Sequence, residues 1–331
     1  MHIRASAPTR IDLAGGTLDI WPIYLFHQNA QTLNAAISLR AHAEILPRKD
    51  GKVRLESIDT DTSLEVSSWQ ELERLDGLPL LARLGHFFQV KSLTLRTRGE
   101  SPAGAGIAGS SAMNVAVCGA LARWAGMTLN ADKFLHIAMN VEAQVINVPT
   151  GLQDYRPAYY GGIASIELRA DGVKRVPLKV DPIELQRRIV LAYTGAPRNS
   201  GTNNWDITKR HIDGDRQVFD CFEHIRDATS GLRQALTKAD WKGAARHIQL
   251  EWDARKQLAP GVTTPAIDEL IASAASAGAR AAKVCGAGGG GCLFCLADPA
   301  DVPAVQKALT DAGATLLEYY IETTGLLVES V

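Results

Sequence analysis

The residues of this chain best suited to chemistry begin with a glycine-rich loop that leads into two serines. Gly104, Gly106 and Gly109 are spaced as G-x-G-x-x-G, and Ser110 and Ser111 follow at the start of an expected apolar helix. Glycines allow backbone N–H groups to close around an anion, and the N-terminus of a helix adds a positive end. A serine hydroxyl can also bind Mg²⁺. The pattern predicts a phosphate-binding loop, with a tight turn capped by serine as the alternative.

An acidic side chain lies on the apolar face of the next expected helix, residues 131–147. Glu142 shares that face, at spacings of three and four, with Leu135, Ala138, Met139, Val145 and Ile146. An unpaired buried carboxylate is costly, so Glu142 needs a cation. Mg²⁺ and an arginine from elsewhere in the chain both satisfy this requirement.

Further candidates flank two glycine-containing turns. Asp154 follows Pro149-Thr150-Gly151, and Arg10 and Asp19 flank the turn at Gly15-Gly16. An aspartate beside glycine and proline is often a turn former, and Arg10 with Asp19 could be an exposed surface pair. The alternative is that these three side chains join one site with the phosphate loop.

Two common nucleotide-binding patterns do not fit. Neither the loop at Gly104 nor a second G-x-G-x-x-G at Gly286, Gly288 and Gly291 ends in the Gly-Lys-Ser/Thr of a Walker loop. A dinucleotide site requires a second strand that ends in an acidic residue about 20 residues on. Asn130 and Asp132 open a helix there instead.

Composition excludes several classes of protein. Lys and Arg total 35 and Asp and Glu total 36 in 331 residues, so no broad positive field predicts nucleic-acid binding. The five cysteines include one C-x-x-C, Cys292 and Cys295, without the second pair of a zinc site, so we expect core thiols in a cytoplasmic protein. No apolar run approaches the roughly 18 residues of a membrane span. The sequence is compatible with a homodimer.

The order of the elements predicts an α+β fold with two domains, residues 1–181 and 182–331. A capping box at Ser68 and Glu71 predicts a helical stretch to about Val90. Residues 194–204 are expected to form a loop, and the chain is expected to end in a pair of strands. Other expected strands are 2–13, 33–46, 52–58, 93–97, 162–168, 173–180, 189–193, 283–285 and 291–297. Expected helices are 110–124, 131–147, 215–238, 240–258, one starting at Pro265, and 303–312.

Three segments in this order resemble the motifs of the GHMP kinase superfamily, which includes galactokinase, homoserine kinase and mevalonate kinase. They are Ala7-Pro-Thr-Arg-Ile-Asp-Leu-Ala-Gly-Gly16, Pro102 through Gly109-Ser-Ser-Ala112, and Lys283-Val-Cys-Gly-Ala-Gly-Gly-Gly-Gly291. The resemblance implies an N-terminal domain like ribosomal protein S5 domain 2, a ferredoxin-like C-terminal domain, and ATP bound between them with Mg²⁺.

The resemblance also implies roles for individual residues. Asp154 matches the catalytic aspartate of the sugar kinases, Arg10 the arginine that pairs with it, and Ser111 and Glu142 the ligands of Mg²⁺. The ATP phosphates would lie on Gly104, Gly106, Ile107, Ala108, Gly109, Ser110 and Ser111. The substrate would contact Asp19, Gly15, Gly16, Thr17, Gly151, Gln153, Arg198, Gly288 and Gly289.

Departures from the family pattern narrow the range of expected substrates. Ala14-Gly15-Gly16 replaces the Gly-Glu-His of galactokinase, which argues against galactose. Ala105-Gly106-Ile107-Ala108 stands where Gly-Leu-Gly is usual in the family. The Ala-Gly-Gly form resembles the heptose 7-phosphate kinase and fucokinase branch. It implies phosphorylation of the anomeric hydroxyl of D-glycero-D-manno-heptose 7-phosphate, for nucleotide-heptose and surface polysaccharide synthesis.

A phosphorylated sugar substrate needs a cation away from ATP. Arg198 is the first candidate, because its loop is rich in glycine and polar residues, and the others are Arg156, Lys209 and Arg210. Two alternatives stay open. One is a kinase of this fold for fucose or a mevalonate-type alcohol, and the other is a nucleotide-binding regulator without catalysis.

Overall fold

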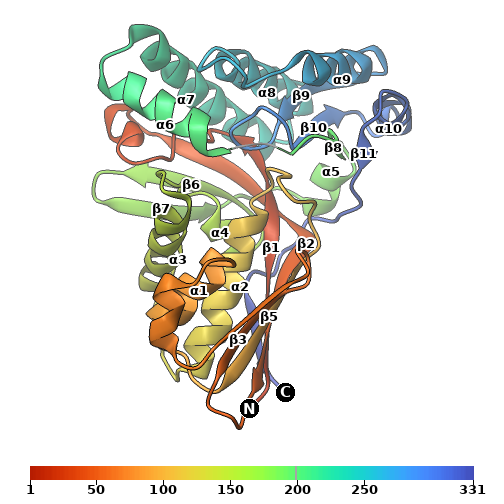
Figure 1. Ribbon diagram of the computed structural model, residues 1–331. Coiled ribbons are helices and arrows are strands. Elements are labelled where there is room, and N and C mark those ends of the chain that lie inside the picture. Colours follow the sequence, from red (N-terminus) through yellow and green to blue (C-terminus); the bar gives the residue numbers. More distant parts are fainter. Residues whose placement is uncertain (198–199) are drawn as a thin grey trace.

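The computed structural model describes residues 1–197 and 200–331, which form two β-sheets with helices packed against each (Figure 1). The larger sheet has eight strands in the order β12-β1-β2-β5-β3-β4, with β6 and β7 attached through β2. Its strands are β1 (Ile3–Ala14), β2 (Gln31–Pro47), β3 (Val53–Ser57), β4 (Thr62–Val66), β5 (Leu93–Gly99), β6 (Ile163–Arg169), β7 (Gly172–Pro177) and β12 (Leu327–Ser330).

The long strand β2 organises this sheet. It pairs with β1 along most of its length, with β5 through residues 41–47, and with β6 through residues 31–35. The sheet therefore divides into two branches along β2. The segment between β5 and β6 carries the predicted phosphate loop, Glu142 and Asp154, so these residues are held close to β1.

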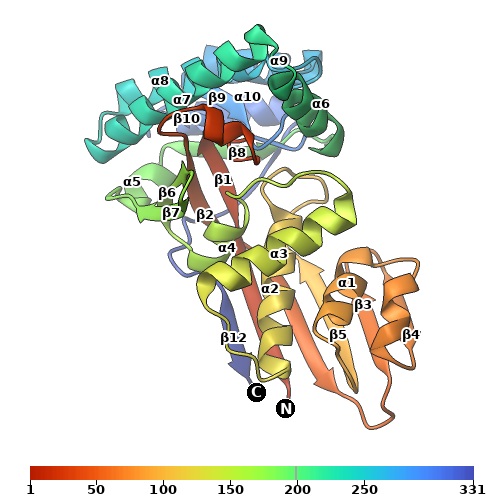
Figure 2. The same ribbon diagram turned by 90° about the vertical axis from the view of Figure 1, so that its left-hand side faces the viewer.

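Helices cover one face of the larger sheet (Figures 1 and 2). They are α1 (Pro79–Phe87), α2 (Gly109–Trp124), α3 (Ala131–Ile146) and α4 (Tyr155–Tyr160). Helix α2 is apolar all round and nearly every residue from Ser111 to Ala122 is buried, because it lies between the sheet and the other helices. This burial fixes the position of its N-terminus.

The smaller sheet has four strands in the order β11-β8-β10-β9. They are β8 (Ile189–Tyr193), β9 (Ala279–Val284), β10 (Cys292–Ala297) and β11 (Thr315–Leu316). Its helices are α5 (Pro182–Gln186), α6 (Ser200–Ile212), α7 (Arg216–Thr237), α8 (Trp241–Arg255), α9 (Pro265–Ser276) and α10 (Val302–Asp311). Figures 1 and 2 show α7, α8 and α9 in a layer above this sheet.

The predicted mixture of helices and sheets is confirmed, and the boundary between residues 181 and 182 stays a prediction. The last strand, β12, returns to the larger sheet and pairs with β1, while β11 pairs with β8. The chain therefore ends in two strands as expected, but these strands belong to different sheets and do not pair with each other. In the part of the chain that the structure describes, no helix is long and apolar enough to cross a membrane.

Four local predictions are wrong. The helical stretch after Ser68 divides into a 3-10 helix, Trp69–Arg74, and α1, because Gly77 and Pro79 interrupt it. Ser68 bonds the side chain of Glu71 rather than a backbone N–H. The expected loop 194–204 becomes helical at Ser200, where α6 begins. Ile146, which the spacing predicts on the apolar face of its helix, is 42% exposed.

Candidate active site

An ion pair between β1 and the start of α4 joins two of the predicted segments. Arg10 donates from Nη2 and Nε to Oδ1 of Asp154, at 2.5 and 3.1 Å, and from Nη1 to the carbonyl of Gly106 at 3.0 Å. Burial would lower the pKa of Arg10, but the charge and hydrogen bond of Asp154, together with the charge of Asp12, outweigh burial and raise that pKa. Arg10 therefore links Asp154 to the phosphate loop. The alternative of an exposed pair with Asp19 is wrong, because Arg10 and Asp19 are both buried.

The loop before α2 has the shape of an anion-binding turn. Gly104, Gly106 and Ala108 all have positive φ, and Ala108 is the N-cap residue without a side-chain cap. The serine-capped turn is therefore not present. Within the described part of the chain, the backbone N–H groups of residues 106–109 donate to no protein acceptor. These donors and the positive end of α2 suit a phosphate.

The predicted burial of Glu142 is confirmed, since only 6% of it is exposed. Ser110 Oγ donates to Glu142 Oε1 at 2.6 Å, and Asn114 Nδ2 lies 3.4 Å from Oε2. Burial raises the pKa of Glu142, and the hydrogen bond from Ser110 offsets only part of this effect. No described lysine or arginine forms an ion pair with it, so the arginine alternative has no support there. The buried carboxylate and adjacent hydroxyls fit the oxygen ligands of Mg²⁺.

Asp19 is held beside the loop that precedes Asp154. Its Oδ2 accepts a hydrogen bond from the backbone N–H of Gln153 at 2.8 Å, and it lies so close to Gly151 that a Cβ there would collide with it. Its Oδ1 is buried without a partner among the described residues. Burial and the charge of Asp154 raise the pKa of Asp19 to about 7. An unpartnered carboxylate oxygen of this kind can accept a hydrogen bond from a ligand hydroxyl.

A cleft of about 630 Å³ runs from the phosphate loop to Glu142 and Asp154. This volume is typical of a small-molecule site. A smaller hollow of about 30 Å³ shares Gly151, Asp154 and Asn204 with it, so Asp154 lies where the two meet. The hollow must widen to admit a sugar. Its lining also includes Arg10, Thr17, Asp19, Gln153, Gly286 and Ala287.

Other predicted substrate residues lie behind this hollow. Gly288 and Gly289 pack against the backbone of Val262 and Gly261, and a Cβ on either would press on them. Gly15 donates its N–H to Glu251, and the carbonyl of Gly16 accepts from Arg255. These four glycines are placed to shape the hollow from outside rather than to line it.

The predicted phosphate-binding cations are dispersed. Arg198 lies outside the described residues. Lys209 and Arg210 form ion pairs with Asp213 and Asp215. Arg156 is 7% exposed and donates to the carbonyl of Leu152 at 2.7 Å. Neither Arg156, Lys209 nor Arg210 lines the small hollow.

Several neighbours of the site were not predicted from the sequence. Asn114 lies one turn into α2 and contacts Glu142, and Tyr155 follows Asp154 directly. Asn204, in α6, lines both the cleft and the hollow. Asn114 is a polar residue within an otherwise apolar helix, and that contrast could have identified it.

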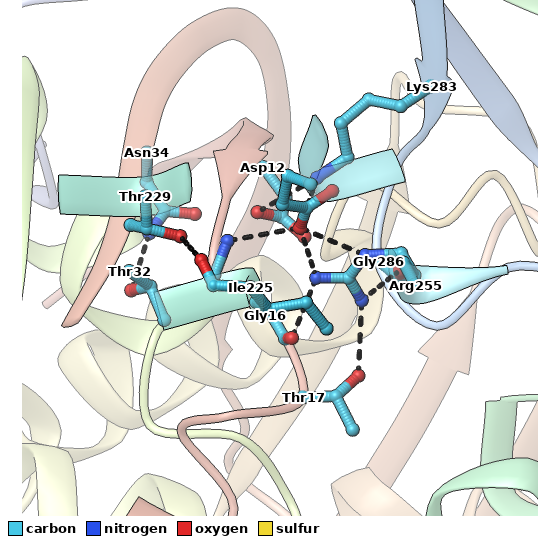
Figure 3. A network of polar contacts seen from close by, with 12 residues as sticks. Asp12, Gly16, Thr17, Thr32, Asn34, Ile225, Thr229, Arg255, Lys283 and Gly286 are labelled. Carbon is cyan, nitrogen blue, oxygen red and sulfur yellow. Dashed lines mark hydrogen bonds and ion pairs between the residues drawn. The ribbon is translucent and has the colours of Figure 1, made fainter. Parts of the chain in front are cut away.

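A buried polar network lies beneath the Gly15-Gly16 turn (Figure 3). Glu251 and Arg255 come from α8, Lys283 from β9 and Asp12 from β1. Each side chain is at most 1% exposed. The network joins the first and third predicted motifs, because Arg255 contacts Gly16, Thr17 and the carbonyl of Gly286.

Known proteins resemble the chain over nearly its whole length. Residues 77–162 match the GHMP kinases N terminal domain, and residues 232–315 match the GHMP kinases C terminal family. The chain is 30% identical to a D-glycero-alpha-D-manno-heptose 7-phosphate kinase of Campylobacter jejuni, over 93% of each chain. It is 26% identical to a mevalonate kinase of Thermococcus sibiricus, over 100% of this chain and 99% of that one.

A solved structure has the same fold. It is a D-glycero-D-manno-heptose 1-phosphate kinase of Bacteroides thetaiotaomicron, with a TM-score of 0.79, 24% identity, and 99% of each chain covered. The two sheets and their helices are therefore those of the two-domain fold that the motifs implied. The chain belongs to the GHMP kinase family of ATP-dependent phosphotransferases.

Proposed function

We propose that this protein transfers the γ-phosphoryl group of ATP to the anomeric hydroxyl of D-glycero-D-manno-heptose 7-phosphate. The observation that carries the proposal is the Arg10–Asp154 pair, where the large cleft meets the small hollow. The similarity to the Campylobacter jejuni heptose 7-phosphate kinase supports the choice of sugar. The product is the 1,7-bisphosphate.

Asp154 is the proposed catalytic residue for the acceptor hydroxyl. Arg10 occupies Oδ1 of Asp154, and no described residue donates to Oδ2, so that oxygen is free to accept the proton of the anomeric hydroxyl. The sugar oxygen forms a bond to the γ-phosphorus as the bond from that phosphorus to the β,γ-bridging oxygen breaks. ADP leaves with the electron pair of the broken bond.

The remaining groups position the reactants and balance charge, as phosphoryl transfer requires. The N–H groups of residues 106–109 bind the phosphates of ATP, and Arg10 offsets negative charge near the γ-phosphate. Glu142, with Ser110 and Ser111, would hold Mg²⁺, which supplies electrostatic stabilisation of the phosphates when bound. Asp19 accepts a hydrogen bond from a hydroxyl of the sugar and fixes its orientation.

The experiment is a substrate panel read by ADP release. Heptose 7-phosphate, unphosphorylated heptose, fucose and mevalonate are each supplied with ATP and Mg²⁺, and ³¹P NMR identifies the position of the new phosphate. The proposal expects the highest kcat/KM with heptose 7-phosphate and a phosphate on C1. Preferred turnover of fucose or mevalonate overturns the assignment of the substrate. ATP binding without turnover of any acceptor favours a non-catalytic regulator.

A mevalonate-type alcohol is the second candidate, and one observation supports it. The mevalonate kinase of Thermococcus sibiricus matches the whole chain at 26% identity. The panel separates the two, because mevalonate has no anomeric centre and no phosphate.

A further inference from the structure

The buried network beneath the first glycine turn is balanced in charge. Asp12 and Glu251 supply two carboxylates, and Arg255 and Lys283 supply two cations, in a region without solvent exposure. Glu251 Oε1 accepts from Arg255 Nε at 3.0 Å, from Lys283 Nζ at 3.0 Å, and from the N–H of Gly15 at 3.1 Å. Burial would raise the pKa of Glu251, but the adjacent charges of Arg255 and Lys283 outweigh burial and hold that pKa below its ordinary value.

Arg255 contacts two different loops with one guanidinium. Its Nη2 donates to the carbonyl of Gly16 at 2.7 Å, and its Nη1 lies 3.3 Å from Thr17 Oγ1 and 3.4 Å from the carbonyl of Gly286. Figure 3 shows Arg255 between these groups. Thr17 and Gly286 both line the small hollow, whereas Arg255 lies outside its lining.

The turn that Arg255 contacts is strained. Thr17 has φ of 69°, a left-handed conformation that is unfavourable for a β-branched residue. Gly15 has φ of 87°, and a Cβ there would collide with the carbonyl of Gln31. A strained backbone persists only where its surroundings over-determine it. Arg255 and Glu251 supply that constraint from the other domain.

We propose that Arg255 is a positioning residue for the acceptor, which it serves by clamping the strained Gly16–Thr17 turn against α8. The turn leads directly to Asp19, two residues after Thr17, so a shift of the turn moves the carboxylate that faces the hollow. The large cleft at the phosphate loop includes neither Arg255 nor any residue of this turn in its lining. The clamp therefore acts on sugar binding and not on ATP binding. This inference rests on the proposed function.

A double-mutant cycle tests the clamp through the KM of the sugar. Arg255→Lys keeps the charge but replaces the planar guanidinium, whose three nitrogens reach Glu251 and the two loops separately, with a single ammonium group that lacks this spread. Thr17→Val replaces the hydroxyl that Arg255 reaches with a methyl group of similar size. Each change is expected to raise the KM of the sugar, by about 10-fold for Arg255→Lys, and to change the KM of ATP less than about twofold. The KM of the sugar in the double variant should exceed that of Arg255→Lys by less than about twofold, because both changes disrupt the same clamp.

The matched control is Arg233→Lys. Arg233 also comes from a helix of the smaller domain, α7, and donates to Gln31 at 2.9 Å and Glu167 at 3.0 Å in the larger sheet. It is expected to change melting temperature without separating the two KM values. The inference is overturned if Arg255→Lys raises the KM of the sugar and the KM of ATP equally. It is also overturned if the double variant raises the KM of the sugar by the product of the two single effects.

Amide hydrogen exchange gives a second readout that needs no substrate. Arg255→Lys should accelerate exchange in a peptide that covers residues 13–20, which contains the bonded N–H of Gly15. A peptide that covers residues 135–146 should exchange as in the unmodified protein. Unchanged exchange at 13–20 overturns the clamp. If the unmodified protein phosphorylates no sugar, the proposed function fails, and the exchange result still decides whether Arg255 clamps the Gly16–Thr17 turn.

Discussion

Arg10 and Asp154 are 144 positions apart in the sequence and share hydrogen bonds of 2.5 and 3.1 Å. The arginine is buried in β1, while 23% of the aspartate side chain is exposed at the start of α4. Arg10 binds one carboxylate oxygen of Asp154 and leaves the other available. The buried arginine therefore orients this carboxylate. This arrangement is the centre of the proposed chemistry.

Replacement of Glu142 should change the dependence on Mg²⁺. Glu142→Gln keeps the size and shape of the side chain but removes the negative charge and leaves one oxygen, instead of two, to accept from Ser110 and Asn114. We expect the Mg²⁺ concentration for half-maximal turnover to rise by about 10-fold or more, because carboxylate charge attracts the ion. Titration of turnover with Mg²⁺ at saturating ATP measures it.

The control for that titration is Glu184→Gln, which alters a partly exposed carboxylate paired with Arg187 and Arg188. It should leave the Mg²⁺ dependence unchanged. An identical titration curve for Glu142→Gln would remove Glu142 from the metal site.

Asp19 should make stability depend on pH. Its pKa is about 7 in the folded protein against an ordinary value of 3.8, so the folded state binds its proton more tightly than the unfolded state. The resulting loss of stability is absent below about pH 4, grows as pH rises, and is complete above about pH 7. Asp19→Asn should therefore stabilise the ligand-free protein at pH 8 by roughly 2–4 kcal/mol, and very little at pH 4.

Urea unfolding across this pH range measures the difference. Asp171→Asn, at an exposed position beside β7, is the control and should show no such trend. A stability difference between Asp19→Asn and the unmodified protein that is constant from pH 4 to pH 8 would contradict the raised pKa. Asp19→Asn should also raise the KM of the sugar.

Ala108 should accept glycine more readily than a larger side chain. Its φ of 62° costs a non-glycine residue about 1–2 kcal/mol. Ala108→Gly removes that strain but adds freedom to the unfolded chain, so stability should change by less than about 1 kcal/mol. Ala108→Val should lose more than about 1 kcal/mol and weaken ATP binding, because a β-branched residue resists this conformation.

Thermal unfolding and isothermal titration with an ATP analogue check both effects. Ala125→Val is the control, since Ala125 ends the same helix with an ordinary φ of −78°. Equal behaviour of Ala108→Gly and Ala108→Val would show that the loop does not depend on this left-handed residue.

Local periodicity predicted much of the fold and part of the site. The apolar helix after the phosphate loop and the burial of Glu142 follow from spacing alone, since three- and four-residue intervals define a helix face. Helix α4 was missed because its six residues include Pro157 and show no period. Terminal strands β11 and β12 join different sheets, and such long-range pairing leaves no mark on a short segment.

The buried network of Asp12, Glu251, Arg255 and Lys283 shows most clearly what the sequence alone could not predict. Glu251 and Arg255 are four residues apart on α8, a spacing typical of an exposed helical ion pair. They are instead fully buried, because Lys283 and the Gly15–Gly16 backbone cover them. That environment depends on how two domains pack, which neither residue's spacing indicates.

The most direct test of the account is the turnover number of Asp154→Asn. Asparagine keeps the size of the side chain and the bond from Arg10 but cannot take the acceptor proton. We predict that kcat falls by at least about 10²-fold while the Kd of an ATP analogue stays within about twofold. Asp132→Asn, at the first turn of α3, should leave both unchanged. An Asp154→Asn protein with near-normal kcat would contradict the proposed role of this aspartate.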